Sequence, residues 1–205
     1  MDWVDYSDLA IELLEGKTVK TVERKSLVGE RIILRPFSKR DLSHIQRWST
    51  DAELRKLTGE VASISQAESD EFYRELRRDE NRIWFVIVLK KGKRVIGEAG
   101  LLRMFRPWRS TDMTIIIGER AAWRKGYGKE AARLLLSYAF EHLGFHRVSI
   151  GVVGFNKNAL RFWKSLGFKK EGVERDAHFC DNKFSDGVMM SILENEYRES
   201  IENAT

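Results

Sequence analysis

Short runs of apolar and β-branched residues recur along the chain and dominate its hydrophobic pattern. Each run has the length of a β-strand, and charged residues, glycine or proline lie at its ends. The pattern therefore predicts strands over residues 31–37, 84–89, 94–102, 113–117, 147–153 and 187–193.

Other segments carry helix signals. Ser38 and the capping box Ser65-Gln-Ala-Glu68 supply side chains that accept hydrogen bonds from first-turn N–H groups, so a helix is predicted after each. In the first of these helices, Leu42, Ile45 and Trp48 are among the apolar positions. Two more helices are predicted over residues 130–140 and 156–166.

The segments follow the order β-α-α-β-β-β-α-β-α-β. Residues 1–28 are predicted to be a helical appendage with a short helix from Ser7 to Glu15, and residues 29–205 to be one domain. A chain of 205 residues is long enough for one well-packed core. The connecting segments 103–109 and 176–186 are expected to be loops.

Composition limits the class of protein. With 42% hydrophobic and 33% charged residues, the chain is typical of a globular protein. No apolar run approaches the ~18 residues that cross a bilayer, and the acidic start is unlike a signal peptide. We therefore expect a cytoplasmic protein without a membrane partner. The single cysteine, Cys180, excludes an internal disulfide framework and a cysteine-rich zinc site, and no metal is expected.

The net charge of +5 would suit an acidic partner such as RNA or a ribosome, but charges of both signs are mixed along the chain. The densest basic and aromatic segment is residues 103–109. Because no RNA-binding signature accompanies it, we interpret it as a solvated loop, and a nucleic-acid partner is not expected.

The segment 123–130 combines features that bind phosphate groups. It lies between a predicted strand and a predicted helix, and Gly126 and Gly128 lack the Cβ atoms that would keep a ligand from the backbone. The first N–H groups of the helix are unpaired, and its dipole favours an anion. The glycine spacing excludes a Walker loop and a dinucleotide fingerprint. Three cations flank the glycines: Arg124, Lys125 and Lys129.

This segment resembles the acyl-CoA loop of the GNAT (GCN5-related) N-acetyltransferases, with its pattern Gln/Arg-x-x-Gly-x-Gly/Ala. A second segment, 156–168, resembles the Asn-x-x-(Ser/Ala)…Leu-Gly-Phe motif of that family and follows in family order. Trp123, residues 31–37 and residues 167–172 resemble the RimJ/RimL-like ribosomal-protein N-terminal acetyltransferase branch. The resemblance covers roughly residues 30–193.

The resemblance implies the GNAT fold, an α/β architecture with a twisted mixed sheet of about seven strands and helices on both faces. It also implies acetyl-CoA as cosubstrate. The strand ending at Ile117 would pair with the pantetheine arm and offer an N–H to the thioester oxygen. Three of the residues implied to bind the cofactor have an alternative role. Asn156 could be a turn residue before the helix, Tyr127 could pack within the loop, and Trp163 could fill the core. The cofactor-binding residues implied are Ile115, Ile116, Ile117, Arg124, Lys125, Gly126, Tyr127, Gly128, Lys129, Asn156 and Trp163.

An amine nucleophile must lose a proton before or during attack. Asp112, at the predicted start of the fourth strand, is the first candidate for the catalytic base, and an exposed strand-start aspartate is its alternative. Glu98 on the preceding strand is the second candidate, because burial in a cleft would raise its pKa. His178 is the third. Trp163 stands where many relatives carry a tyrosine that protonates the leaving thiolate, so the general acid is unassigned.

The predicted function is acetyl transfer from acetyl-CoA to a primary amine by direct attack on the thioester. The branch resemblance favours a protein N-terminus, and a small amine of polyamine or aminoglycoside type is the alternative. A non-catalytic acyl-CoA-binding regulatory module is a further alternative, and a homodimer is expected as an assembly. The acceptor pocket is expected from residues 48–65, 105–110 and 176–186, with Trp48 and Trp108 as aromatic walls and Asp51, Glu53, Glu60 and Asp181 as carboxylates for a polyamine.

Overall fold

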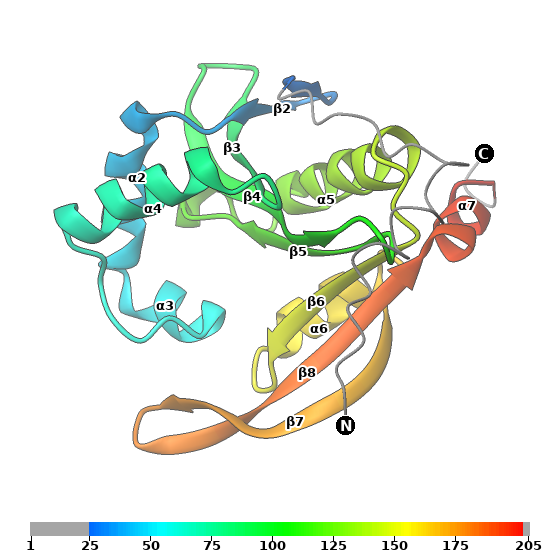
Figure 1. Cartoon of the computed structure of the whole chain (residues 1–205). Coiled ribbons are helices and arrows are strands. Elements are labelled where there is room, and N and C mark those ends of the chain that lie inside the picture. Colours follow the sequence, from blue (N-terminus) through cyan, green and yellow to red (C-terminus); the bar gives the residue numbers. More distant parts are fainter. Residues whose placement is uncertain (1–24, 203–205) are drawn as a thin grey trace, which may run out of the picture.

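The computed structural model describes residues 25–202, so the predicted helix from Ser7 to Glu15 lies outside the described residues. This part of the chain contains both helices and strands (Figure 1). The elements are β1 (Leu27–Val28), β2 (Ile32–Pro36), the 3₁₀ turn η1 (Lys39–Asp41), α2 (Leu42–Ser49), α3 (Ala52–Thr58), α4 (Gln66–Arg78), β3 (Ile83–Leu89), β4 (Val95–Phe105), β5 (Ser110–Ile116), η2 (Arg120–Ala122), α5 (Tyr127–Ser137), the π-helical turn η3 (Tyr138–His142), β6 (Arg147–Val153), α6 (Lys157–Lys164), β7 (Lys169–Cys180), β8 (Lys183–Leu193) and α7 (Glu194–Glu202).

The strands between residues 25 and 202 form one eight-stranded sheet in the order β1-β2-β3-β4-β5-β6-β8-β7. Every neighbouring pair is antiparallel except β5 and β6, which run parallel. This mixed sheet confirms the predicted architecture with one strand more than the seven expected. Leu27–Val28 adds to the edge of the sheet as β1, although these residues were assigned to the appendage.

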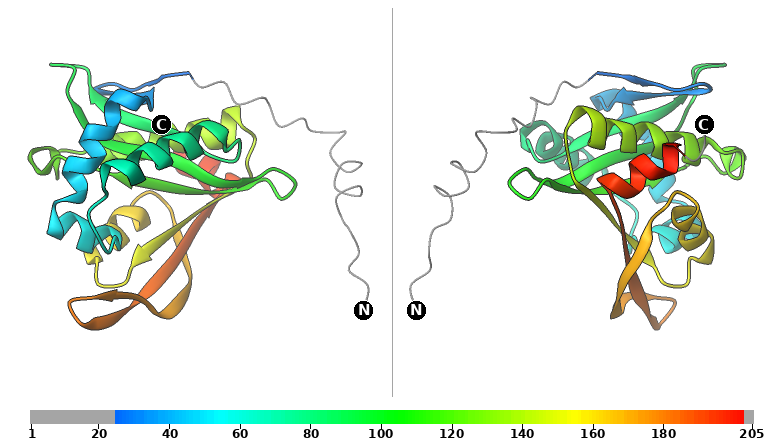
Figure 2. Two further views of the ribbon diagram at one scale, coloured as in Figure 1. Left: turned by 60° about the vertical axis from the view of Figure 1, so that its left-hand side comes forward. Right: turned by 90° about the vertical axis from the view of Figure 1, so that its right-hand side faces the viewer.

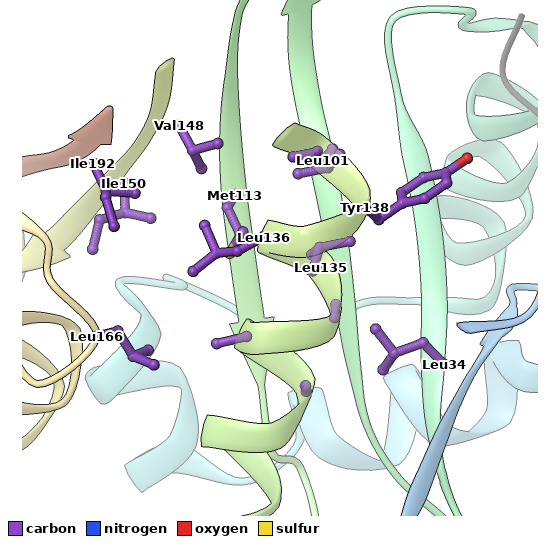
Figure 3. Packing of buried hydrophobic residues seen from close by; sticks show 14 of the residues in the cluster. Leu34, Leu101, Met113, Leu135, Leu136, Tyr138, Val148, Ile150, Leu166 and Ile192 are labelled. Atoms are coloured by element: carbon purple, nitrogen blue, oxygen red, sulfur yellow. The ribbon is translucent and has the colours of Figure 1, made fainter. Parts of the chain in front are cut away.

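Helices cover both faces of the sheet, as predicted (Figures 1 and 2). On one face, Phe85 of β3 meets the ring of Tyr138 edge-on at 6.2 Å, and Leu135 of α5 is fully buried in the same core (Figure 3). On the other face, Trp84 meets Phe72 of α4 at 5.6 Å. Because successive strand residues point to opposite faces, α5 and α4 lie on opposite sides of β3.

Local signals explain the predicted helix ends. Ser65 Oγ accepts from the Glu68 N–H at 3.3 Å and Glu68 Oε2 accepts from the Ser65 N–H at 2.7 Å, which completes the capping box of α4. Asn156 Oδ1 accepts from the Ala159 N–H at 3.0 Å and caps α6. Beyond α6, Gly167 has a left-handed backbone with φ of +93°, which favours glycine.

Two helices were not predicted. Residues 52–58 form α3, which begins at the N-cap Asp51 and ends at Gly59 with φ of +82°. Both cap residues were visible in the sequence, but seven residues are too few to show a clear apolar period. The last helix, α7, follows β8 directly. No helix among the described residues has both the length and the apolar composition needed to cross a bilayer.

The segment 176–186 was expected to be a loop, and this is wrong. It forms the ends of β7 and β8, which extend beyond the other strands as a long hairpin (Figure 2). Its residues are mostly exposed, so no alternation of apolar and polar positions identified it. An aromatic pair holds the hairpin instead, because Phe179 lies opposite Phe184 with ring centroids 4.9 Å apart.

Candidate active site

β5 and β6 separate along their length and open the middle of the sheet (Figure 1). Their pairing is limited to Ser110 with Arg147, Thr111 with Val148 and Asp112 with Ser149. Beyond this point β5 continues to Ile116 and β6 to Val153 without pairing to each other. The half-buried residues Ile115, Ile116 and Ile117 lie in or next to this part of β5. Its backbone groups on the β6 side can therefore pair with an extended ligand.

The start of α5 is arranged to hold an anion. The N-cap of α5 is Gly126, with φ of +82°, and no side chain caps the helix. Arg124 is also left-handed, with φ of +58°, and such alternation turns successive N–H groups to one side. Within residues 25–202, no carboxylate pairs with Arg124, Lys125 or Lys129. The loop is therefore suited to a diphosphate.

Glu130 fixes this loop to β2. One of its oxygens accepts from the N–H groups of Arg31 at 2.7 Å and Ile32 at 3.2 Å, and the other accepts from Arg31 Nε at 3.0 Å. Burial alone would raise the pKa of Glu130, but these donors hold it below its usual value. Arg31 also donates to the Lys125 carbonyl at 2.9 Å and lies over the Tyr127 ring, 5.0 Å from its centroid. Tyr127 thus packs under a guanidinium.

Phe162 of α6 lies across the opening from β5. The Cβ position of Gly128 is 3.7 Å from both Ile117 Cγ1 and Phe162 Cε2, so α5, α6 and the end of β5 meet there. The next residue, Trp163, is buried and packs against Phe162 and Phe168, with ring centroids 4.9 Å and 5.0 Å away. Trp163 therefore fills the core, and Phe162 is the aromatic side chain of α6 at the opening.

Both polar ends of the Asn156 side chain are bonded within the protein. Its Oδ1 caps α6, and its Nδ2 donates to the Leu57 carbonyl of α3 at 3.0 Å. Asn156 therefore joins α6 to α3, which agrees with the turn-residue alternative. Its contact with a CoA arm stays a prediction.

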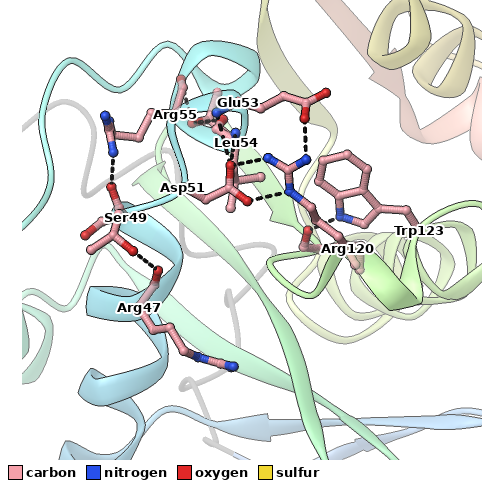
Figure 4. A network of polar contacts seen from close by, with 11 residues as sticks. Arg47, Ser49, Asp51, Glu53, Leu54, Arg55, Arg120 and Trp123 are labelled. Atoms are coloured by element: carbon pink, nitrogen blue, oxygen red, sulfur yellow. Dashed lines mark hydrogen bonds and ion pairs between the residues drawn. The ribbon is translucent and has the colours of Figure 1, made fainter.

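An ion-pair network ties α3 to the connection between β5 and α5 (Figure 4). Arg120 Nε and Nη2 donate to the two oxygens of Asp51 at 2.6 Å and 2.5 Å, and Arg120 Nη1 pairs with Glu53. Asp51 also accepts from the first N–H groups of α3, at Glu53 and Leu54. The Arg120 guanidinium and these N–H groups hold the pKa of Asp51 well below its usual range.

Two tryptophans fix the end of β5. The Trp123 indole N–H donates to the Ile117 carbonyl at 2.6 Å, so this carbonyl is bonded within the protein. Trp48 of α2 covers Gly118, where a Cβ would overlap its ring. The Trp48 indole also donates to Glu119 at 3.0 Å. α2 is therefore held over the end of β5.

Glu98 is a buried carboxyl on β4, opposite Ile116 of β5 in the strand register. The Trp84 indole N–H donates to it at 2.8 Å, so it lies on the α4 face of the sheet. Burial raises its pKa to about 7, against the Trp84 hydrogen bond and with a smaller contribution from the charge of Glu60. A carboxyl with this pKa is partly ionised at neutral pH and is suited to accept a proton.

The other two proton-transfer candidates lie elsewhere. Asp112 is at the opposite end of β5, where β5 still pairs with β6, and forms an ion pair with Arg103. His178 lies on β7 beside the end of α3, and its Nδ1 is 3.1 Å from the Cβ position of Gly59. The structure therefore does not bring Asp112, Glu98 and His178 together.

The segment 105–110 does not reach the open end of β5. Phe105 pairs with Ser110 at the far end of that strand, where β4 turns into β5. Trp108 is 78% exposed and packs edge-on against Phe105, with ring centroids 5.0 Å apart. The length of β5 carries this segment away from Ile116, and its part in an acceptor pocket stays a prediction.

Most of the carboxylates expected at the acceptor site are already paired. Asp51 and Glu53 bind Arg120, and Asp181 at the hairpin binds Lys56 of α3. Glu60, which follows α3, has no ion pair among the described residues. The charge of Glu60 also contributes to the raised pKa of Glu98.

No role in the site was predicted for Arg31, Glu130, Phe162 or Arg120. Glu130 had a local signal, since an acidic residue in the first turn is typical of a helix start. Phe162 lies within the predicted helix 156–166, and nothing in that pattern distinguished it from the other apolar residues of the helix. Arg31 acts on a residue 99 positions away and Arg120 on one 69 positions away, and neither contact leaves a local pattern.

Comparisons with known proteins agree with this geometry. A family model for the acetyltransferase (GNAT) domain matches residues 31–169. The uncharacterized N-acetyltransferase p20 of Bacillus licheniformis is 27% identical over 84% of this chain and 98% of its own. An N-acetyltransferase 9-like protein of Caenorhabditis briggsae is 26% identical over 74% of this chain and 81% of its own. Among solved structures, the spermidine N-acetyltransferase from Vibrio cholerae, in complex with CoA and spermine, superposes with a TM-score of 0.77 and 25% identity, covering 82% of this chain and 98% of that chain.

Proposed function

The chain belongs to the acetyltransferase (GNAT) family, and we propose that it transfers the acetyl group of acetyl-CoA to a small polycationic amine, with Glu98 accepting the proton of the amine. Acetyl-CoA supplies the acyl group as an activated thioester. The chain has to bind this cosubstrate, orient it and take up a proton beside it.

The opening between β5 and β6 is the proposed cosubstrate site. The N–H groups around Gly126 and Gly128, with Arg124, Lys125 and Lys129, would hold the diphosphate. The unpaired edge of β5 up to Ile116 would pair with the extended arm and offer an N–H donor to the acyl oxygen. Phe162 would wall this channel from the α6 side.

The observation that carries the catalytic proposal is the burial of Glu98 opposite Ile116. An alkylamine has a pKa near ~10.4 and a peptide α-amine near ~8, so both are mostly protonated at pH 7. A carboxyl with a pKa of about 7 accepts a proton from either more readily than an ordinary exposed glutamate does. No tyrosine stands at position 163, and we assign no general acid to the leaving thiolate.

Charge favours a polycationic acceptor. Glu98, the candidate base, and Glu60, one of the carboxylates expected for a polyamine, have no ion pair among the described residues, and the charge of Glu60 acts on Glu98. A second amine of the acceptor would bind Glu60 while the reacting amine lies at Glu98. The similarity to a spermidine acetyltransferase in complex with spermine supports this choice.

A protein N-terminus is the second candidate acceptor. The resemblance of residues 31–37 and Trp123 to the RimJ/RimL-like branch favours it. The two acceptors predict different pH profiles, because proton loss from the amine limits the rate. Activity on a peptide should level off near pH ~8, whereas activity on spermidine should still rise above pH ~9.

A thiol-release assay with acetyl-CoA distinguishes these acceptors. We expect release of CoA with spermidine and spermine, and weaker release with peptides that begin in Ser, Ala or Met. Turnover of the peptides alone would favour the N-terminal acetyltransferase. Calorimetric binding of acetyl-CoA without turnover of any amine would contradict the enzyme and favour a regulatory module.

A further inference from the structure

A second cavity lies far from the opening between β5 and β6. It has a volume of about 560 Å³ and is lined by residues of β1 to β4, η1 and α2. This volume is within the ~300–1,000 Å³ that small-molecule sites occupy. The cavity is at the β1–β2 edge of the sheet, so it does not belong to the cosubstrate site.

The floor of this cavity is apolar. Val28, Ile33, Val88 and Val95 line it, one from each of four adjacent strands. Val28 is 62% exposed, although it is a β-branched strand residue. Apolar side chains that line a cavity favour an occupant with an apolar body.

The rim of the cavity carries a net positive charge. Arg35 and Asp41 also line it, but they neutralise each other through two hydrogen bonds of 2.6 Å and 3.1 Å. Arg40 and Lys93 remain, and neither side chain has a partner among the described residues. Two uncompensated cations above an apolar floor select an anion over a cation.

We propose that this cavity binds a small amphipathic anion, in which an apolar chain or ring carries a carboxylate or phosphate group. The apolar body would lie on the four strand residues, and the anionic group would lie between Arg40 and Lys93. The rim repels a polycationic amine, so this ligand is not the proposed acceptor. The inference does not depend on the proposed function.

The occupant would touch α2, the helix that is held over the end of β5. His44 of α2 lines the cavity and stacks on Trp48, with ring centroids 5.7 Å apart and an interplanar angle of 27°. Trp48 in turn covers Gly118 and donates to Glu119 at the end of β5. The cavity and the end of β5 are therefore in contact with neighbouring turns on one face of a short helix.

Calorimetric titration of the full chain with sodium decanoate, below its micelle concentration, tests the proposal. We expect saturable binding that persists when the protein is saturated with acetyl-CoA. The double variant Arg40→Glu/Lys93→Glu should lose at least about tenfold in affinity. Lys39→Glu/Lys91→Glu is the matched control, since it reverses two neighbouring charges that do not line the cavity. The control should stay within about twofold of the unmodified protein.

Each other outcome would overturn the proposal. Absence of binding would show that the cavity takes no such ligand, and displacement by acetyl-CoA would place decanoate in the cosubstrate site. If decyltrimethylammonium bound as tightly as decanoate, the cavity would not select its ligand by charge. If deletion of residues 1–16 raised decanoate affinity by about tenfold or more, the cavity would belong to that acidic segment, which includes Asp2, Asp5 and Asp8.

Discussion

The two sides of the opening between β5 and β6 are built in different ways. The loop proposed to hold the phosphates is made by consecutive residues, 123–130, and would bind mostly through backbone N–H groups. The proposed acceptor side combines α2, α3, β4 and the β7–β8 hairpin, and contacts such as Asn156 with Leu57 join residues 99 positions apart. Changes in the loop should therefore affect acetyl-CoA binding, whereas changes on the acceptor side should affect the amine and leave acetyl-CoA binding intact.

The largest effect is expected from Gly126→Val. Gly126 has φ of +82°, and a Cβ there would lie 3.1 Å from Arg31 Nη2, so valine would distort the loop. We expect no saturable binding of acetyl-CoA in calorimetry. Gly92→Val is the control, because Gly92 has φ of +80° with no atom within 4 Å of its Cβ position. It should bind acetyl-CoA normally. Equal loss of acetyl-CoA binding in both variants would contradict the assignment of the loop as the acetyl-CoA site.

Glu98→Gln should impair proton transfer on the acceptor side and leave acetyl-CoA binding by the loop unchanged. Removing a proton acceptor lowers kcat/KM by ~10²–10⁴, and acetyl-CoA affinity should not change. In the unmodified enzyme, the rate should rise as Glu98 ionises through pH about 7, and the variant should lose this limb of the profile. A near-normal rate in Glu98→Gln would exclude Glu98 as the base.

Glu98 should also make stability depend on pH. Its folded pKa of about 7 is above its usual 4.5, so its contribution to stability is fully present below pH 4.5 and lost as pH rises through 7. Glutamine does not ionise. The free energy of unfolding of Glu98→Gln, relative to the unmodified protein, should therefore increase by about 3 kcal/mol between pH 4 and pH 8. Urea titrations of both proteins at both pH values measure this difference. If the difference in the free energy of unfolding were the same at pH 4 and pH 8, that would contradict a buried, protonated Glu98.

The same difference explains how far the sequence could predict this molecule. Glycine spacing and helix capping act over a few residues, so the loop and the start of α6 were predictable. Leu27–Val28 pairs at the sheet edge with residues that a local pattern does not include, and the hairpin around Phe179 is mostly exposed. The local pattern of apolar and polar residues therefore did not predict either strand pairing. Glu98 was a candidate, but its burial under Trp84 is a property of the assembled sheet.

A smaller effect is expected from Arg120→Ala, which removes the link between α3 and the connection after β5. Ion pairs between exposed side chains contribute little to stability, so the free energy of unfolding should change little. We expect the KM for the amine to rise a few-fold while acetyl-CoA affinity stays within about twofold. Lys129→Ala is the converse control, because it should weaken acetyl-CoA binding only. A loss of acetyl-CoA affinity in Arg120→Ala would mean that the two sides are not separable.

The smallest effect is expected from Asp112→Asn, which sharpens the comparison between the two candidate bases. Asp112 lies where β5 and β6 are still paired, and its carboxylate is already bound to Arg103. A carboxylate that is held by an arginine is not free to meet an incoming amine. We expect kcat/KM within about twofold of the unmodified enzyme and an unchanged pH profile. A loss of about 100-fold would instead return the base to Asp112 and would require the amine to reach the closed end of the opening.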